Sequence, residues 1–198
     1  LVMAIFFLLL CLGIGLYFVA LRGPALLPLG VAGLGLVLAY TQWITRHPLL
    51  CLVAPGLGFG PLMVLGTQVA LTGQYSSTAV AASLVPFFLV NNLLLLNQFP
   101  DVAADRVVGR RHVVVISGTR VAARWYAAMT ALAFASLTMA VAADYLPSGA
   151  LLGLLTLVLA VPTVLTVLAH AHDVPKLLPA MGSNVVICIA TPLLVAIG

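Results

Sequence analysis

Charged residues are scarce in this chain. Only 6% of its 198 residues are charged, with four acidic and eight basic side chains, whereas 64% are hydrophobic and the mean hydropathy is +1.26. A water-soluble domain needs a far more charged surface, so the composition excludes a soluble protein. The net charge of +4 is also too small to suggest nucleic-acid binding. The chain is therefore predicted to lie in a lipid bilayer.

Cysteine chemistry and a cleaved leader are also not indicated. Cys11, Cys51 and Cys188 lie far apart inside apolar runs, without a CxxC motif or a histidine at ligand spacing, so we expect small buried hydrophobic residues. The chain begins with Leu-Val-Met inside an apolar run, without a charged segment or a small-residue cleavage site. We therefore expect a single transmembrane domain over residues 1–198, truncated at its N-terminus.

Long apolar runs dominate what is present, and each is long enough for a membrane-spanning helix of about 20 residues. Polar or helix-breaking segments such as Arg22-Gly23-Pro24 separate the runs. We predict an all-α, multi-spanning transmembrane helical bundle with about seven helices. The predicted spans are approximately residues 1–21, 25–43, 49–72, 78–96, 121–143, 149–169 and 177–197.

The basic residues are distributed unequally between the two ends of such a bundle. If the spans alternate in direction, the loops after the second, fourth and sixth spans share one face. Seven of the eight basic residues lie there: Arg46, Arg106, Arg110, Arg111, Arg120, Arg124 and Lys176. Arg22 lies on the opposite face. The positive-inside rule then predicts that the arginine-rich face is cytoplasmic. The membrane we expect is the inner or plasma membrane of a prokaryote.

One stretch, residues 97–118 with the sequence NQFPDVAADRVVGRRHVVVISG, carries a chemical signature. Asp101 and Asp105 are four residues apart, so both carboxylates share a face if the preceding helix continues for another turn. Such a pair repels unless Mg²⁺ or an arginine neutralises it. Arginines at 106, 110 and 111 follow closely and can bind phosphate oxygens. The stretch predicts a Mg²⁺–diphosphate site.

Each of these features also has a simpler interpretation. From spacing alone, the aspartate pair fits a solvated helix cap, and the arginines fit membrane orientation and anionic lipid. Asn91 and Asn92 are interpreted as interhelical hydrogen-bonding groups. His170, His172 and Asp173 are metal-ligand types, but their place at a helix end favours interfacial anchors.

The pattern NxxxDxxxDRxxGR resembles the second aspartate motif of the UbiA superfamily of intramembrane prenyltransferases. The resemblance is closest to the menaquinone-type branch, which prenylates dihydroxynaphthoate. The matching positions are Asn97, Asp101, Asp105, Arg106, Gly109 and Arg110. His112 replaces the usual threonine, and Pro100 replaces a basic residue. The run from Gly56 to Gly73 is similar to a glycine-rich span of that branch, and Tyr40-Thr41 matches a helix-ending Tyr-Thr pair.

The resemblance implies a site and its ligands. Family members have nine helices and a first motif, NDxxD, which does not occur here, so the seven spans would correspond to family helices three to nine. By resemblance, Asp101 and Asp105 would be catalytic and ligate Mg²⁺, and Arg106 and Arg110 would bind diphosphate. Asn97 would orient a ligand or water. Tyr40 fits an interfacial aromatic belt, and as a residue lining the channel it is a further substrate-binding candidate. The prenyl chain would lie in an apolar channel open to lipid.

The predicted function is Mg²⁺-dependent transfer of a polyprenyl group from polyprenyl diphosphate to an aromatic or quinone-precursor acceptor within the membrane. The missing NDxxD motif leaves a catalytically incomplete fragment as the alternative. A transporter or structural subunit fits less well, because the ionisable groups cluster at one face and not at mid-span. A CDP-alcohol phosphotransferase would need a DxxDGxxAR run, which this sequence lacks.

Overall fold

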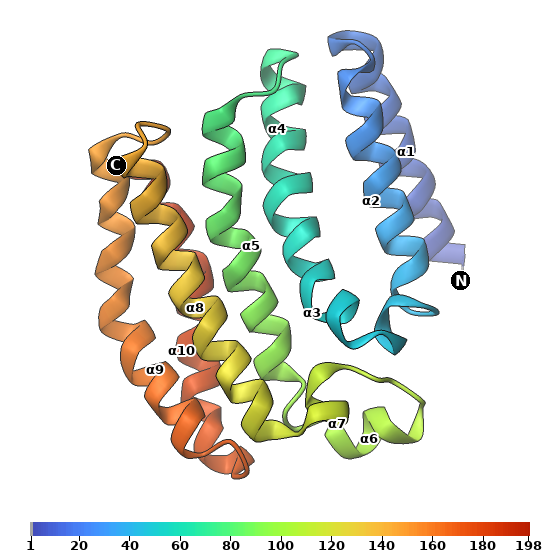
Figure 1. The fold of residues 1–198 in the computed structure, drawn as a ribbon. Helices are drawn as coiled ribbons and strands as arrows, with labels where there is room; N and C mark the ends of the chain where they lie inside the picture. Colours follow the sequence, from blue (N-terminus) through green and yellow to red (C-terminus); the bar gives the residue numbers. More distant parts are fainter. Residues whose placement is uncertain (1) are drawn as a thin grey trace.

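The chain folds as an α-helical bundle (Figure 1). The structure, a computed structural model, describes residues 2–198, and no strand occurs in this range. The long helices run alternately up and down, so that neighbours in sequence pack side by side. The predicted all-α fold class is confirmed.

Six helical segments of the described range are long and apolar enough to cross a membrane. They are α1 (Val2–Arg22), the continuous pair α3 (Pro48–Leu57) and α4 (Met63–Thr72), α5 (Ser77–Asn97), α8 (Thr119–Ala142), the segment Ser148–Ala169 with α9 (Leu157–Ala169), and α10 (Val174–Ile197). Two short helices, α6 (Val102–Val107) and α7 (Val113–Ser117), lie between α5 and α8. Leu1, the first residue of the first predicted span, lies outside the described range.

The second predicted span is present but shorter than expected. A 3₁₀ turn (Pro24–Leu26) leads into α2 (Leu27–Tyr40), and the apolar segment ends at Tyr40 and not near residue 43. Turns follow, because the Thr45 hydroxyl bonds back to the Thr41 carbonyl at 2.9 Å and Pro48 begins the next helix. This seventh apolar segment therefore falls short of the usual length for a straight span.

The glycine- and proline-rich run inside α3 and α4 forms a bend. Pro55 and Pro61 interrupt the hydrogen-bond ladder, and residues Gly58–Leu62 form a π-helical turn. This turn packs tightly on α5, because a Cβ added to Gly60 would lie 2.6 Å from the Ser83 carbonyl oxygen. Glycine is therefore required where the two helices cross.

Buried amides connect the helices in the interior, as predicted for Asn91 and Asn92. Asn91 Oδ1 accepts from the Gly56 N–H at 2.6 Å, which joins α5 to α3. Asn92 Nδ2 donates to the Tyr126 carbonyl of α8 at 3.0 Å, and the Tyr126 hydroxyl donates to Asn184 of α10 at 2.8 Å. In an apolar membrane interior such bonds fix which helices are neighbours.

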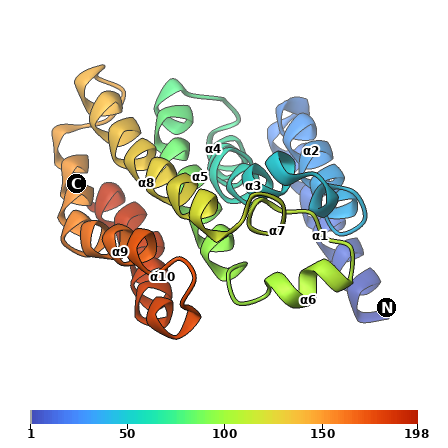
Figure 2. The same ribbon diagram turned by 60° about the horizontal axis from the view of Figure 1, so that its bottom comes forward.

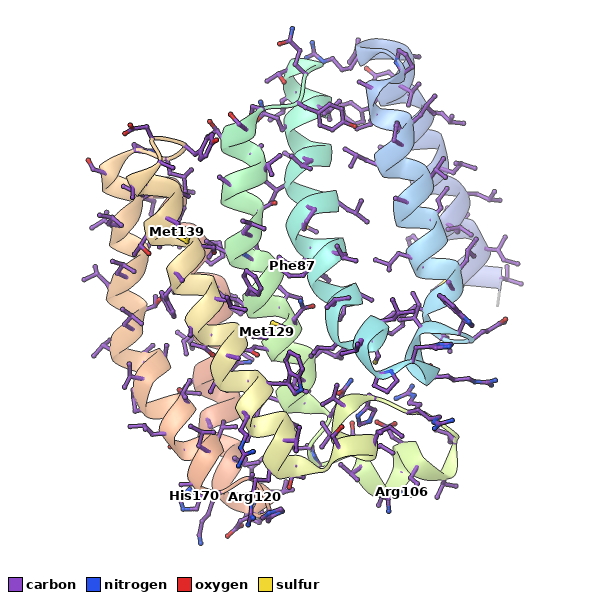
Figure 3. All side chains as sticks on the ribbon, in the orientation of Figure 1. Phe87, Arg106, Arg120, Met129, Met139 and His170 are labelled. Atoms are coloured by element: carbon purple, nitrogen blue, oxygen red, sulfur yellow. The ribbon has the colours of Figure 1, made fainter. Side chains whose placement is uncertain are left out.

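The loops after α2, α5 and α9 lie at one end of the bundle (Figure 1). Arg106, Arg120 and His170 all lie at this end (Figure 3). Arg22 lies at the opposite end, where its Nε donates to the Ala70 carbonyl at 3.0 Å. The segregation of basic residues to one end is therefore present in the fold, and the cytoplasmic assignment of that end stays a prediction.

The α1–α2 hairpin differs from the rest of the bundle because neither helix contains a buried residue. An apolar groove of about 690 Å³ separates it from α4. Cys11 lies exposed on α1, so the prediction that all three cysteines are buried is wrong for this one; Cys51 is buried and Cys188 is partly buried. Cys11 is one of the side chains that line this groove.

Candidate functional site

The acidic loop, residues 98–118, begins with a break in the helix. The helix does not continue for another turn past the predicted end of this span, so the condition set for a shared face is not met by α5: α5 ends at Asn97, and a turn over residues 98–101 precedes α6. Pro100 explains this, because it has no N–H to donate and disfavours helical backbone in the preceding residue. A new helix therefore starts immediately after Asp101.

The two aspartates nevertheless lie one helical turn apart. Asp101 precedes the first residue of α6, and the Asp105 N–H donates to the Asp101 carbonyl at 2.8 Å. Residues at this spacing share a helix face. The backbone thus brings the two residues within one turn at the start of α6, a separate short helix at the end of the bundle, and the shared face of their carboxylates stays a prediction.

The environments of the two carboxylates are very different. Asp101 is exposed, whereas Asp105 is buried with 6% of its surface accessible. Asp105 Oδ1 accepts from Arg110 at 2.8 Å, and Oδ2 accepts from His112 Nε2 at 2.9 Å. The neutralising partner predicted for the acidic pair is therefore present for Asp105 within the protein itself.

His112 was not among the residues that the sequence predicted to be functional. The structure buries it to 2% exposure, with its Nδ1 also buried and without a hydrogen-bond partner. Two features bring its ring to Asp105: the left-handed turn at Gly109, with φ +77°, and the hydrogen bond from the Arg110 N–H to the Asp105 carbonyl at 3.0 Å. The one feature of the sequence that pointed to His112 was that it replaces the threonine usual at this position of the motif.

Hydrogen bonds attach the acidic loop to the turn before α3 and to α3 itself. The Arg111 N–H donates to the Thr45 carbonyl at 2.9 Å, and Gln98 Nε2 donates to Cys51 Sγ at 3.6 Å. The buried residues Val113 and Val114 anchor α7 in the apolar core. Figure 2 shows α6 and α7 across this end of the bundle, with α7 beside α3.

The other predicted site residues lie around this loop. Arg106 is exposed on α6 and projects at the end of the bundle (Figure 3), and Asn97 is exposed at the last residue of α5. Tyr40 is half-buried at the end of α2, where it packs against the apolar cluster that contains Cys51. Since Cys51 also contacts Gln98, Tyr40 lies near the base of the acidic loop.

A second polar cluster lies where α9 and α10 meet. The Thr119 hydroxyl and His172 Nδ1 are 2.6 Å apart, and Lys176 pairs with Asp173 at 2.9 Å. The hydrogen bond from the Lys176 side chain lowers the pKa of the Asp173 carboxyl. This cluster fits helix capping, because the Asp173 carboxylate also accepts from the Lys176 N–H.

The donor set of the acidic loop fits Mg²⁺ in one particular manner. Within residues 2–198, no three His, Cys, Asp or Glu side chains are placed to hold a metal ion together. Two carboxylates one turn apart do match the way Mg²⁺ is often bound, through one or two carboxylates with phosphate oxygens completing the shell. The loop therefore suits a metal that arrives with a diphosphate.

Comparison with known proteins identifies the family. The model of the UbiA prenyltransferase family matches residues 1–178. The chain belongs to this family. No curated protein and no solved structure matches it. Membership of the UbiA prenyltransferase family, together with the long apolar helices, makes this an integral multi-pass membrane protein from a family of membrane prenyltransferases.

Proposed function

We propose that this chain transfers a polyprenyl group from polyprenyl diphosphate to an aromatic or quinone-precursor acceptor within the membrane, with Mg²⁺ as cofactor. The observation that carries the proposal is the acidic loop itself. Exposed Asp101 lies one turn from Asp105, and Arg110 already neutralises Asp105 at 2.8 Å. Acidic and basic groups of this kind suit a metal ion and a diphosphate, respectively.

The proposed roles follow from the exposure of each side chain. Asp101 and Asp105 would hold Mg²⁺, which supplies neutralisation of the diphosphate as its charge develops. Arg106 is exposed and Arg110 is 47% exposed, so both can reach phosphate oxygens in solvent. Asn97 at the end of α5 would orient a ligand or a water molecule beside them.

The chemistry is a substitution at the first carbon of the prenyl chain. The bond from that carbon to the diphosphate oxygen breaks, and its electron pair leaves with the diphosphate. An electron-rich ring carbon of the acceptor then bonds to the allylic cation, and the ring loses a proton to solvent. Fixed arginines stabilise the leaving group because they are oriented before its charge develops.

The apolar surroundings support a lipid-soluble donor. The groove of about 690 Å³ between the α1–α2 hairpin and α4 is lined almost entirely by apolar side chains. Such a groove suits a hydrocarbon chain in contact with lipid. We further propose a menaquinone-type acceptor such as dihydroxynaphthoate, on the basis of the loop sequence, and a cytoplasmic position for the acidic loop, on the basis of the basic residues.

A transfer assay in membranes tests this proposal. Membranes containing the chain receive radiolabelled polyprenyl diphosphate and dihydroxynaphthoate, with Mg²⁺ or with a chelator. We expect labelled lipid-soluble product only in the sample with Mg²⁺, and not in the sample with the chelator. A variant carrying Asp101→Ala and Asp105→Ala should form no product. Chelator-resistant transfer, or unchanged transfer in that variant, would contradict the assigned roles.

A second candidate is a catalytically incomplete chain that binds diphosphate without transferring the prenyl group. The described residues favour it in one respect, since among residues 2–198 no three His, Cys, Asp or Glu side chains are placed to hold a metal ion together. This candidate predicts Mg²⁺-dependent retention of labelled polyprenyl diphosphate and no product with any acceptor.

A further inference from the structure

The two hydrogen-bond partners of Asp105, Arg110 and His112, differ greatly in how freely their side chains can move. Arg110 donates to Oδ1 at 2.8 Å, and its side chain is 47% exposed. His112 donates to Oδ2 at 2.9 Å, and its side chain is 2% exposed. An exposed guanidinium leaves by rotating its own side chain, whereas a buried ring leaves only if its packed neighbours move. Arg110 is therefore the partner that can exchange.

His112 is fixed on Asp105 by its chemistry and its place in the chain. The carboxylate can only accept, so the hydrogen in this bond belongs to Nε2 of the imidazole. The residue directly precedes α7, and Val113 and Val114, which follow it, are both buried. The ring is thereby placed to hold Oδ2 while Oδ1 changes partner.

We infer that Arg110 takes the place of a metal ion at Oδ1 of Asp105 in the ligand-free chain. When a diphosphate binds, the Arg110 guanidinium moves to the phosphate oxygens. This inference rests on the proposed function, and it concerns how binding of the metal ion and binding of the diphosphate affect each other. A guanidinium presents the same fork of N–H donors to carboxylate and phosphate, so Arg110 loses no pairing in the exchange. His112 keeps the carboxylate in position throughout.

The exchange predicts coupling between the metal and the diphosphate. Without a diphosphate, Arg110 competes with a divalent cation for Oδ1, and its charge also repels that cation. With a diphosphate present, Arg110 has another anionic partner and Oδ1 becomes available. Coupling of this kind is reciprocal, so each ligand favours binding of the other. The loop would then bind a divalent ion alone only weakly.

Direct Mn²⁺ binding to the purified full chain in detergent tests the inference without any turnover. Free Mn²⁺ is measured by electron paramagnetic resonance, with no phosphate present. We expect Arg110→Gln to bind Mn²⁺ about fivefold more tightly than the wild type, the factor that loss of one partly exposed charged pair implies. Adding Asp105→Asn to Arg110→Gln should abolish the gain, which locates the ion at this carboxylate.

Arg111→Gln is the matched control, because it removes the same charge from the neighbouring residue, which contacts Thr45 through its backbone and has its side chain exposed. Arg110→Lys keeps the charge and should stay near wild-type affinity. It therefore distinguishes loss of the charge from damage to the fold caused by replacing Arg110. Equal affinities for Arg110→Gln and Arg111→Gln would overturn the inference, as would absence of Mn²⁺ binding in every variant. Neither result touches the proposed function, which the transfer assay decides separately.

Discussion

The crossing of the α3–α4 segment with α5 offers a test of how the bundle holds the acidic loop. Gly60 lies in the π-helical turn that contacts α5. In a Gly60→Ala variant the new Cβ would lie 2.6 Å from the Ser83 carbonyl oxygen, 2.8 Å from Phe87 Cβ and 2.9 Å from Phe87 Cα. Backbone atoms, and the Cβ attached to them, cannot rotate away, so the helices must separate.

The size of the effect follows from these distances. Ordinary contacts between carbon atoms are about 3.5–4.0 Å, so the two segments must move apart by about 1 Å. Overpacking of a close-packed interior costs about 1–3 kcal/mol. Replacing glycine by alanine in a helix returns about 0.5–1 kcal/mol. The cost less the return spans about 0–2.5 kcal/mol, and we therefore expect Gly60→Ala to lower the free energy of unfolding by about 1 kcal/mol, near the middle of that range.

Gly66→Ala is the matched control in the same segment. Gly66 lies in α4, and nothing lies within 4 Å of a Cβ added there. This variant should gain the helical contribution of about 0.5–1 kcal/mol without a clash. The measurement is unfolding by sodium dodecyl sulfate in mixed micelles, followed by circular dichroism. Equal stability of the two alanine variants would refute the tight crossing.

Three further predictions concern single side chains. Asp105→Asn should lower the stability of the chain by about 2 kcal/mol, because the buried Asp105 carboxylate accepts hydrogen bonds from both Arg110 and His112. Asp101→Asn, at an exposed position, should change the stability by less than about 0.5 kcal/mol. Thermal unfolding distinguishes the two variants, and both should lose prenyl transfer. Tyr126→Phe should cost about 1 kcal/mol in the same assay, because Asn184 loses its donor. Ser76→Ala removes the cap of α5 and should cost about 1 kcal/mol, with Ser76→Asp as the variant that restores it.

The long helices were predictable because each is a long apolar run between polar or helix-breaking segments, whereas their first residues are set by capping side chains. α5 begins after Ser76, whose hydroxyl caps the helix, and α10 begins after Asp173, which does the same. The end of α2 was missed because the segment remains apolar through Trp43, and hydropathy alone does not detect the turn that Thr45 stabilises. A boundary set by one side-chain hydrogen bond in a turn is not encoded in hydropathy.

The acidic loop was only partly predictable for a similar reason. The spacing of Asp101 and Asp105 and the nearness of Arg110 follow directly from the sequence. The bond from His112 to Asp105 does not, because a separation of seven residues in a loop has no fixed geometry. It depends on the positive φ of Gly109, which reverses the chain, and on burial of the residues that follow.

The helix crossing at Gly60 and the acidic loop both depend on the position of α5. Asn91 fixes α5 to α3 through the Gly56 N–H, and Gln98, just beyond the end of α5, bonds to Cys51 of α3. Since the loop continues from α5, any separation of α5 from α3 displaces Asp101 and strains the attachment at Cys51. Gly60→Ala should therefore reduce Mg²⁺-dependent transfer even at temperatures where the variant remains folded, whereas Gly66→Ala should not. A fully active Gly60→Ala chain would mean that the loop is positioned by α7 and α8 alone.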